Sequence, residues 1–263
     1  MRRRLDVELV RRGLVPSRTR AAEIIDAGRV IVGGSPASTP ARQVDGAEPI
    51  AVLAGSGPEY VSRGGRKLAA GLDAFALEVA GRRALDAGAS TGGFTDCLLQ
   101  RGARHVYAVD VGRSQLAWSL RQDSRVTVME RTNLRQLGPG ALDPAPDLCV
   151  ADLSFISLRT VAPNLVGLAT PGADFVLLVK PQYEAGRARV GRRGIVRDPA
   201  VHRAVLQEVV AGLDSARLGV RAVVPSPLRG ADGNAEFLAH ARLGTATVAA
   251  SALDDAVLRA GAQ

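Results

Sequence analysis

Short apolar segments recur along residues 62–263, and each is separated from the next by a stretch with helical character. Segments this short, bounded by turn-forming residues, indicate strands that are buried on both faces. Strands that alternate with helices form an open, mainly parallel sheet with helices on both faces, so an α/β domain is expected here. The expected strands are 84–87, 106–109, 126–129, 148–151 and 175–179, with 220–224 and 236–241 completing the far edge. The expected helices are 93–99, 114–121, 158–168, 199–213 and 254–260.

Residues 1–53 have a different pattern and are expected to form a separate, small α+β domain. Two short helices are expected, the second with Ser17 as its N-cap and Gly28 at its end. The run 30–32 and the two glycines after it indicate a short strand and a turn. Residues 54–61 have the composition of a linker.

The basic character of the chain indicates a polyanionic partner. The net charge is +8 and the isoelectric point is about 10.6, which favours nucleic acid over a membrane surface. Residues 1–29 contain eight arginines and four acids, and this local excess of positive charge is half of the net charge of the chain. A charged face in contact with water is the alternative explanation of this composition. A second arginine-rich segment, 182–198, is either an RNA clamp or a solvated loop. The arginines expected to bind RNA are Arg3, Arg4, Arg11, Arg12, Arg18, Arg20, Arg29, Arg187 and Arg189.

Several classes of protein do not fit the sequence. No stretch approaches the roughly 18 apolar residues of a membrane span, and charged residues interrupt the segment that a signal peptide would need. A cytoplasmic location is therefore expected. The two cysteines and three histidines are dispersed, so neither a metal site nor a redox motif is expected.

Lysine is rare in this chain, because 32 of its 34 basic residues are arginines. The exceptions are Lys67 and Lys180. An ammonium group can lose its proton at an accessible cost, whereas a guanidinium cannot. Unless these two residues are lysine by chance, they are candidates for proton chemistry.

A glycine-rich loop follows the first strand, in the sequence Asp86-Ala-Gly-Ala-Ser-Thr-Gly-Gly-Phe-Thr95. Glycines let the backbone turn sharply and lie against a ligand where such a sheet opens. Asp110 lies 24 residues beyond Asp86, at the end of the second strand, where a carboxylate can accept hydrogen bonds from a ribose diol. Dinucleotide-binding proteins share this plan, and a tight turn without a ligand is the alternative. The Gly-x-Ser-x-Gly-Gly spacing and the carboxylate of Asp86 favour S-adenosylmethionine. The expected cofactor contacts are Asp86, Gly88, Ser90, Gly92, Gly93, Asp110, Asn133 and Asp152, of which Asn133 could equally be a turn residue.

Four charged residues are expected at the ends of neighbouring strands. Lys180 follows the apolar run 175–179, and Asp152 follows 148–151. Lys67 precedes the first strand, and Glu236 begins the last one. A ribose hydroxyl needs a proton acceptor and groups that orient it, and two lysines with two carboxylates could supply both. Strand-end caps or structural ion pairs are the alternative interpretation of each carboxylate.

The segment Leu9–Gly34, which contains Leu9-Val-Arg-Arg-Gly-Leu-Val-Pro-Ser-Arg-Thr-Arg-Ala-Ala-Glu, resembles the RNA-binding module of the small-subunit ribosomal protein S-four. The rest of the chain resembles the TlyA-type (haemolysin A) family, whose catalytic domain groups with FtsJ-type ribose methyltransferases. The motifs that carry this resemblance are Ser62-Arg-Gly-Gly-Arg-Lys-Leu68, Leu85–Thr95, Gln115–Leu120, Glu130-Arg-Thr-Asn133, Ala151–Ser157, Val179-Lys-Pro-Gln182 and Gly233-Asn-Ala-Glu236.

This resemblance implies a Rossmann-like methyltransferase sheet and S-adenosylmethionine as cofactor. It also implies a catalytic tetrad of Lys67, Asp152, Lys180 and Glu236, and 2′-O-methylation of cytidine in 23S and, in some members, 16S ribosomal RNA. Ribosomal RNA or a ribosomal subunit is then the partner, with no membrane and no obligate protein partner. The segment Pro58-Glu-Tyr-Val departs from the basic-aromatic linker of some relatives, which puts coupling through it in doubt.

Other functions fit less well. A methyltransferase for exocyclic amines would be expected to carry Pro-Pro-aromatic after the fourth strand, where this chain has Asp152-Leu-Ser-Phe. Cys149 lies inside a strand and is expected in the core, so it is a poor nucleophile. Arg4-Leu5-Asp6 mimics a pseudouridine synthase triplet without the domain around it. No amphipathic segment supports a membrane-active haemolysin. A non-enzymatic ribosome-binding factor is the alternative that remains.

Overall fold

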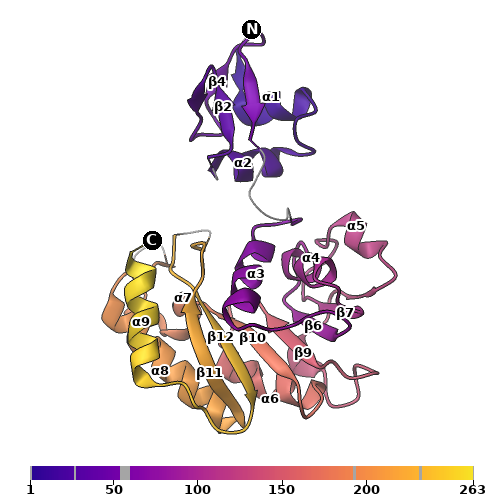
Figure 1. Cartoon of the computed structure of the whole chain (residues 1–263), viewed down its shortest axis with the longest axis vertical. Coiled ribbons are helices and arrows are strands. Elements are labelled where there is room, and N and C mark those ends of the chain that lie inside the picture. The colour runs from indigo at the N-terminus through magenta and orange to yellow at the C-terminus, as the bar shows by residue number, and fades with distance from the viewer. Residues whose placement is uncertain (1, 27, 54–59, 192–193, 231–232, 263) are drawn as a thin grey trace. The chain divides into compact units, whose positions relative to one another are not determined.

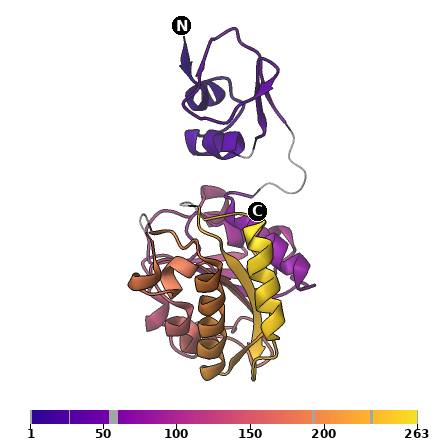
Figure 2. The same cartoon turned by 90° about the vertical axis from the view of Figure 1, so that its left-hand side faces the viewer.

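The computed structural model describes the whole chain except residues 1, 27, 54–59, 192–193, 231–232 and 263. The chain divides into two compact units, Met1–Glu59 and Tyr60–Gln263, drawn in Figures 1 and 2. Most of the segment expected as a linker, 54–61, lies outside the described residues. Tyr60, at the end of that segment, is buried in the core of the second unit.

The first unit packs two helices against short strands. The second helix begins as expected, because Ser17 Oγ accepts the backbone N–H of Arg20 at 3.1 Å. Gly28 follows the helix with a φ of +68°, a left-handed conformation that glycine adopts without strain. The elements are β1 (Arg3–Arg4), α1 (Leu5–Arg11), α2 (Arg18–Asp26), β2 (Val30–Val32), β3 (Ser35–Pro36), β4 (Gln43–Val44) and β5 (Ile50–Val52). Strand β1 pairs with β4, and β2 lies between β3 and β5.

The second unit is built on a seven-stranded sheet in the order β11-β12-β10-β9-β6-β7-β8. Its central strands are parallel, as expected, and β12 runs antiparallel to both of its neighbours, β10 and β11. The strands are β6 (Arg83–Ala87), β7 (His105–Val109), β8 (Val126–Met129), β9 (Leu148–Ala151), β10 (Asp174–Val179), β11 (Leu218–Pro225) and β12 (Phe237–Leu243).

Helices cover both faces of this sheet. Strand β10 illustrates the arrangement, because alternate side chains point to opposite faces: Phe175 and Leu177 lie in one core cluster, and Val176 and Leu178 in the other. In Figures 1 and 2, α8 and α9 lie side by side on one face. The helices are α3 (Gly64–Ala74), α4 (Gly93–Gln100), α5 (Trp118–Arg121), α6 (Leu158–Leu168), α7 (Pro181–Glu184), α8 (Pro199–Ser215) and α9 (Ala250–Gly261), with short 3-10 turns η1 (Leu134–Gln136) and η2 (Arg187–Arg189). Among the described residues, no helix is long and apolar enough to cross a membrane.

Several elements differ from the expectation, among them α7, which was not expected, and α9, which begins four residues earlier than expected. The helix expected over 114–121 begins only at Trp118, because the carboxylate of Glu130 accepts the backbone N–H groups of Ser114, Gln115 and Leu116 and holds them in a loop. Helix α3 was not expected at all, since it begins with two glycines. A Cβ on the second of them, Gly65, would lie 2.3 Å from the ring of Tyr60, so the glycine permits this close packing.

Candidate active site

Three of the four expected catalytic residues lie at one edge of the sheet because of the strand directions. Asp152 and Lys180 directly follow β9 and β10, two parallel strands. Glu236 precedes β12, and because β12 is antiparallel, its beginning lies at the same edge as the ends of the others. The pairing of Val179 with Phe237 sets Lys180 and Glu236 one residue further along neighbouring strands. Lys67 reaches this edge from α3, as its contact with Glu236 demonstrates.

Lys180 and Asp152 form one ion pair. The distance from Lys180 Nζ to Asp152 Oδ1 is 2.5 Å, but its direction does not make it a hydrogen bond, and Asp152 Oδ1 has no hydrogen-bond partner among the described residues. Lys180 Nζ instead donates to Ser154 Oγ at 3.0 Å. The lysine side chain is 12% exposed and the aspartate side chain 23%, so the pair is partly accessible.

Lys67 and Glu236 form a second ion pair, in which Lys67 Nζ donates to Glu236 Oε2. Both side chains are buried, at 9% and 3% exposure. A buried ammonium that keeps its charge needs such a counter-charge, because it has lost its hydration. The four charged residues are therefore arranged as one buried pair and one accessible pair.

Gly88 brings the glycine-rich loop against the strand end that carries Asp152. Its φ is +87°, and a Cβ at this position would lie 2.5 Å from the carbonyl oxygen of Asp152. Gly92 has a φ of +97° and would meet Leu120 at 2.2 Å, and Gly93 would meet Ser62 Oγ at 2.2 Å. Side chains at these positions would push the loop away from its neighbours, so the three glycines are needed for its close approach.

Asp86 is fully buried at the end of β6. Thr95 Oγ1 donates to its Oδ2 at 2.6 Å, while Oδ1 is buried without a hydrogen-bond partner among the described residues. Burial, helped by the nearby charges of Asp152 and Asp110 and opposed by the hydrogen bonds from Thr95, raises the pKa of Asp86 to about 7. An unsatisfied buried carboxylate oxygen is suited to the cationic end of S-adenosylmethionine, so these residues fit that group.

Asp110 fixes the tip of the loop. Its Oδ2 accepts the backbone N–H of Ser90 at 2.8 Å and its Oδ1 that of Gly112 at 2.6 Å. Ser90 itself has a φ of +47°, uncommon for a residue with a side chain, and its hydroxyl donates to Gln115 Oε1 at 3.3 Å. Asp110 thus organises the loop in addition to any contact with a ribose.

Asn133 lies at the start of η1, where its Oδ1 accepts the backbone N–H of Arg135 at 3.0 Å. This is the turn role that was left open for it, and its adenine contact stays a prediction. Glu130, to which no role was assigned, accepts three backbone N–H groups of the neighbouring loop and pairs with Arg121. The backbone hydrogen bonds lower its pKa.

Two aromatic residues beside Lys180 were also missed. Phe155 is 89% exposed and has a φ of +64°, unusual for a bulky residue, and its ring centroid lies 5.1 Å from that of Tyr183. Tyr183 lies under Lys180, with Nζ 5.9 Å from its ring centroid. With Gln182, Gly186 and others, these rings line a cavity of about 470 Å³. The sequence places Phe155 and Tyr183 shortly after two strands, but it does not reveal that the ring of Phe155 is exposed.

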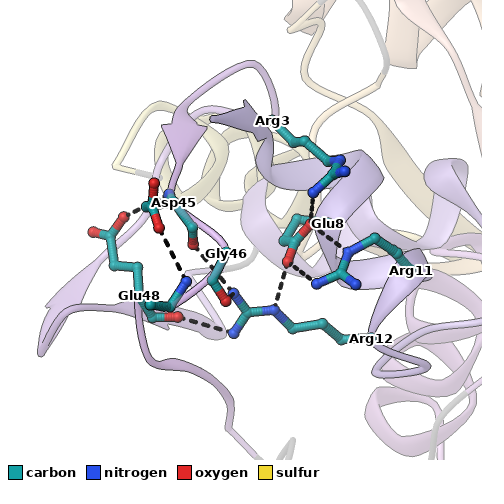
Figure 3. Close-up of polar contacts among 8 residues, drawn as sticks. Arg3, Glu8, Arg11, Arg12, Asp45, Gly46 and Glu48 are labelled. Atoms are coloured by element: carbon teal, nitrogen blue, oxygen red, sulfur yellow. Dashed lines mark hydrogen bonds and ion pairs between the residues drawn. The ribbon is translucent and has the colours of Figure 1, made fainter. Parts of the chain in front are cut away.

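The arginines expected to bind RNA are mostly engaged within their own units. In the first unit, Arg4 and Arg18 bind Asp6, and Arg3, Arg11 and Arg12 surround Glu8 (Figure 3). Arg29 donates to the carbonyl of Leu53, and the backbone N–H of Arg20 is bound by Ser17. In the second unit, Arg187 is exposed at the start of η2 and Arg189 pairs with Glu208. Part of the loop 182–198, residues 192–193, lies outside the described residues. RNA contact by these arginines stays a prediction.

Comparison with known proteins covers both units. The profile of the FtsJ-like methyltransferase family matches residues 60–243, and that of the S4 domain matches residues 3–50. The chain is 53% identical over 263 residues to the 16S/23S rRNA (cytidine-2'-O)-methyltransferase TlyA of Mycobacterium tuberculosis, covering 98% of this chain and 97% of that protein. It is 39% identical over 239 residues to Hemolysin A of Brachyspira hyodysenteriae, covering 90% and 98%. A solved structure of a candidate hemolysin from Streptococcus thermophilus superposes with a TM-score of 0.79 at 39% identity, covering 98% and 95%.

Proposed function

This chain belongs to the FtsJ-like methyltransferase family, and we propose that it transfers a methyl group from S-adenosylmethionine to a cytidine ribose 2′-hydroxyl in 23S ribosomal RNA, 16S ribosomal RNA or both. The observation that carries the proposal is the accessible Lys180–Asp152 pair beside the buried Lys67–Glu236 pair. The name of the Mycobacterium tuberculosis relative supports the choice of substrate. The chain acts where ribosomes are assembled, in the cytoplasm.

The accessible pair handles the proton of the reacting hydroxyl. After its ammonium group has released a proton to solvent, Lys180 Nζ accepts the proton of the 2′-hydroxyl, since it lies at the edge of the sheet where the strands end. Asp152 and Ser154 hold Nζ in position from the neighbouring strand end. Lys67, held by Glu236, lies at the same edge, where it orients the substrate.

Asp86, Gly88, Ser90 and Asp110 would hold the cofactor. When bound, the cofactor supplies a methyl group on a positively charged sulfur, which the 2′-oxygen can accept. The buried carboxylate of Asp86 faces that charge, and the glycine-rich loop brings backbone close to the ligand. The S4 domain supplies the affinity for structured RNA through its basic residues.

The test is methylation of ribosomal RNA taken from a strain that lacks the gene. The purified chain, labelled S-adenosylmethionine and isolated ribosomal subunits should yield 2′-O-methylcytidine at a defined nucleotide, located by mass spectrometry. Calorimetry should detect S-adenosylmethionine binding. A chain that binds ribosomal RNA but neither binds the cofactor nor methylates would be a non-enzymatic ribosome-binding factor, and the proposal would be wrong.

A further inference from the structure

Glu8, on α1 of the S4 domain, is an acid in an unusual place. Its side chain is 1% exposed although it lies on a small and strongly basic unit. Three arginines surround its carboxylate (Figure 3). Arg11 binds it as a fork, with Nε at 2.8 Å from Oε2 and Nη2 at 2.6 Å from Oε1. Arg12 Nε donates to Oε1 at 2.8 Å, and Arg3 Nη1 lies 4.0 Å from Oε2.

The three arginines differ in what remains accessible. Arg12 is only 21% exposed, and its other nitrogens donate to the backbone carbonyls of Asp45, Gly46 and Glu48, so it joins α1 to that loop. Arg11 is 51% exposed and Arg3 39% exposed. The fork uses Nε and Nη2 of Arg11, which leaves its Nη1 nitrogen outside the contact with Glu8. Arg11 thus combines a hydrogen-bonded end with a solvent-facing one, and Arg3 is held near it by an ion pair at 4.0 Å.

Considered only as a negative charge, Glu8 should weaken RNA binding. The hydrogen bonds from Arg11 and Arg12 lower the pKa of Glu8 to about 2, so it is negative at neutral pH. A permanent negative charge under a phosphate-binding surface reduces counter-ion release and long-range attraction. Asp6 repeats the arrangement, because it is buried and binds Arg4 and Arg18, which are 45% and 62% exposed. Two buried acids under one basic surface must contribute something other than charge.

We propose that Glu8 is a positioning residue for RNA binding, which fixes Arg11 through two hydrogen bonds and attracts Arg3 through an ion pair, in the arrangement that meets the RNA phosphates. Free arginine side chains sample many rotamers, and ordering them when RNA binds costs affinity. A buried carboxylate that holds them beforehand removes that cost, as pre-organised guanidinium groups bind phosphate oxygens with defined geometry. This inference rests on the proposed function, because it assumes that the S4 domain binds ribosomal RNA.

The direction in which one substitution changes the affinity for RNA tests the idea. Glu8→Gln removes a negative charge, so a purely electrostatic surface would bind RNA more tightly and with a steeper dependence on salt. Loss of positioning predicts the opposite: RNA affinity should fall about tenfold, and its dependence on salt should become shallower. Tenfold is about the scale of the free-energy cost of ordering two long side chains on binding. Glu48→Gln is the matched control, because it removes the same charge from the same unit. The Glu48 carboxylate contacts Arg42 and the backbone of Asp45 and does not touch Arg3, Arg11 or Arg12.

The experiment measures binding of the full chain to unmethylated 23S and 16S ribosomal RNA over a series of salt concentrations. We expect Glu8→Gln to bind more weakly than wild type and Glu48→Gln to bind equally well or more tightly. A Glu8→Gln chain that binds as tightly as Glu48→Gln would overturn the proposal. If the wild type neither binds nor methylates this RNA, the proposed function fails instead, so the two failures are distinct.

Folding of the S4 domain is checked by amide hydrogen exchange in α1. If Glu8→Gln loses protection there, Glu8→Asp replaces it, since this variant keeps the charge and shortens the reach by one methylene. It should then bind RNA more weakly than wild type at unchanged net charge. Unchanged binding by a folded Glu8→Asp chain would also overturn the proposal.

Discussion

Lys180 and Asp152 form a 2.5 Å ion pair across the ends of two adjacent parallel strands, β10 and β9. This pair is partly accessible, with side chains 12% and 23% exposed, whereas Lys67 and Glu236 are 9% and 3% exposed. The two lysines thus occupy different environments at one edge of the sheet. This difference predicts different consequences for their substitution.

Lys180→Arg keeps the positive charge but removes the group that can accept a proton. We expect the single-turnover methylation rate to fall by about 10²–10⁴-fold, the range for a lost acid–base group. Calorimetric affinity for S-adenosylmethionine and the thermal unfolding midpoint should stay close to wild type. A near-normal rate would falsify the assignment of Lys180 as proton acceptor.

Glu236→Gln leaves the buried ammonium of Lys67 without a counter-charge. Removing one partner of a buried ion pair costs about 3–5 kcal/mol, so the free energy of unfolding should fall by that order. Adding Lys67→Met should recover part of the loss, because no buried charge then remains, while methylation stays impaired. Denaturant unfolding of both single variants and the double variant measures this coupling. Strictly additive losses would mean that the two side chains do not interact.

Asp86 should make cofactor binding depend on pH. Burial raises its pKa to about 7, so the carboxyl is largely neutral at pH 6 and largely charged at pH 8. Because the cofactor is cationic at its methionine end, its affinity should rise as the pH rises through 7. Calorimetry between pH 6 and 8 should detect this rise in wild type and a flatter profile in Asp86→Asn. Parallel profiles in the two proteins would contradict the assignment.

The titration of Asp86 also affects folding stability, which should fall over the pH range in which cofactor affinity rises. Between pH 4 and 7 the folded state keeps a proton on Asp86 that the unfolded chain has released, since the ordinary pKa of an aspartate is 3.8. The free energy of unfolding should therefore fall from about pH 4 to about pH 7 through this group and level off above. The difference between wild type and Asp86→Asn isolates this contribution, and its absence would show that Asp86 titrates normally.

The two units should have separable functions, cofactor binding in the second and RNA binding in the first. A chain of residues 60–263 should bind S-adenosylmethionine with wild-type affinity but methylate ribosomal RNA poorly, because it lacks the S4 domain. It should begin at Tyr60 because that side chain packs against Gly65 in the core. Calorimetry and single-turnover methylation are the two measurements. Methylation at the full-length rate would mean that the S4 domain contributes little to RNA binding.

Much of the fold was predictable because apolar runs define buried strands. The strands 126–129 and 148–151 and the helix 158–168 have the expected bounds. Helix α3 was not predictable, since its first residues, Gly64 and Gly65, disfavour a helix and are selected by contact with Tyr60 and with the loop around Gly93. Tertiary contacts of this kind leave no local signal in a sequence.

The pairing of the charged residues at the candidate site could not be predicted from the sequence. Strand ends identified Asp152 and Lys180, and their chemistry identified Lys67 and Glu236, but nothing in the sequence says which lysine pairs with which carboxylate. The burial of Asp6 and Glu8 was equally hidden, because acids in a basic segment are normally solvated. The arginines around them were expected to contact RNA or to form a solvated face, and the structure shows that most of them bind their own unit.

The antiparallel strand β12 lies between β10 and β11, although it comes last of the seven in the sequence. A growing chain that has been synthesised only as far as β11 cannot complete the sheet, because the strand that belongs beside β10 does not yet exist. Glu236 arrives with that strand, so Lys67 remains without its partner until then. A chain that stops before β12 therefore lacks both the strand beside β10 and the carboxylate that pairs with Lys67.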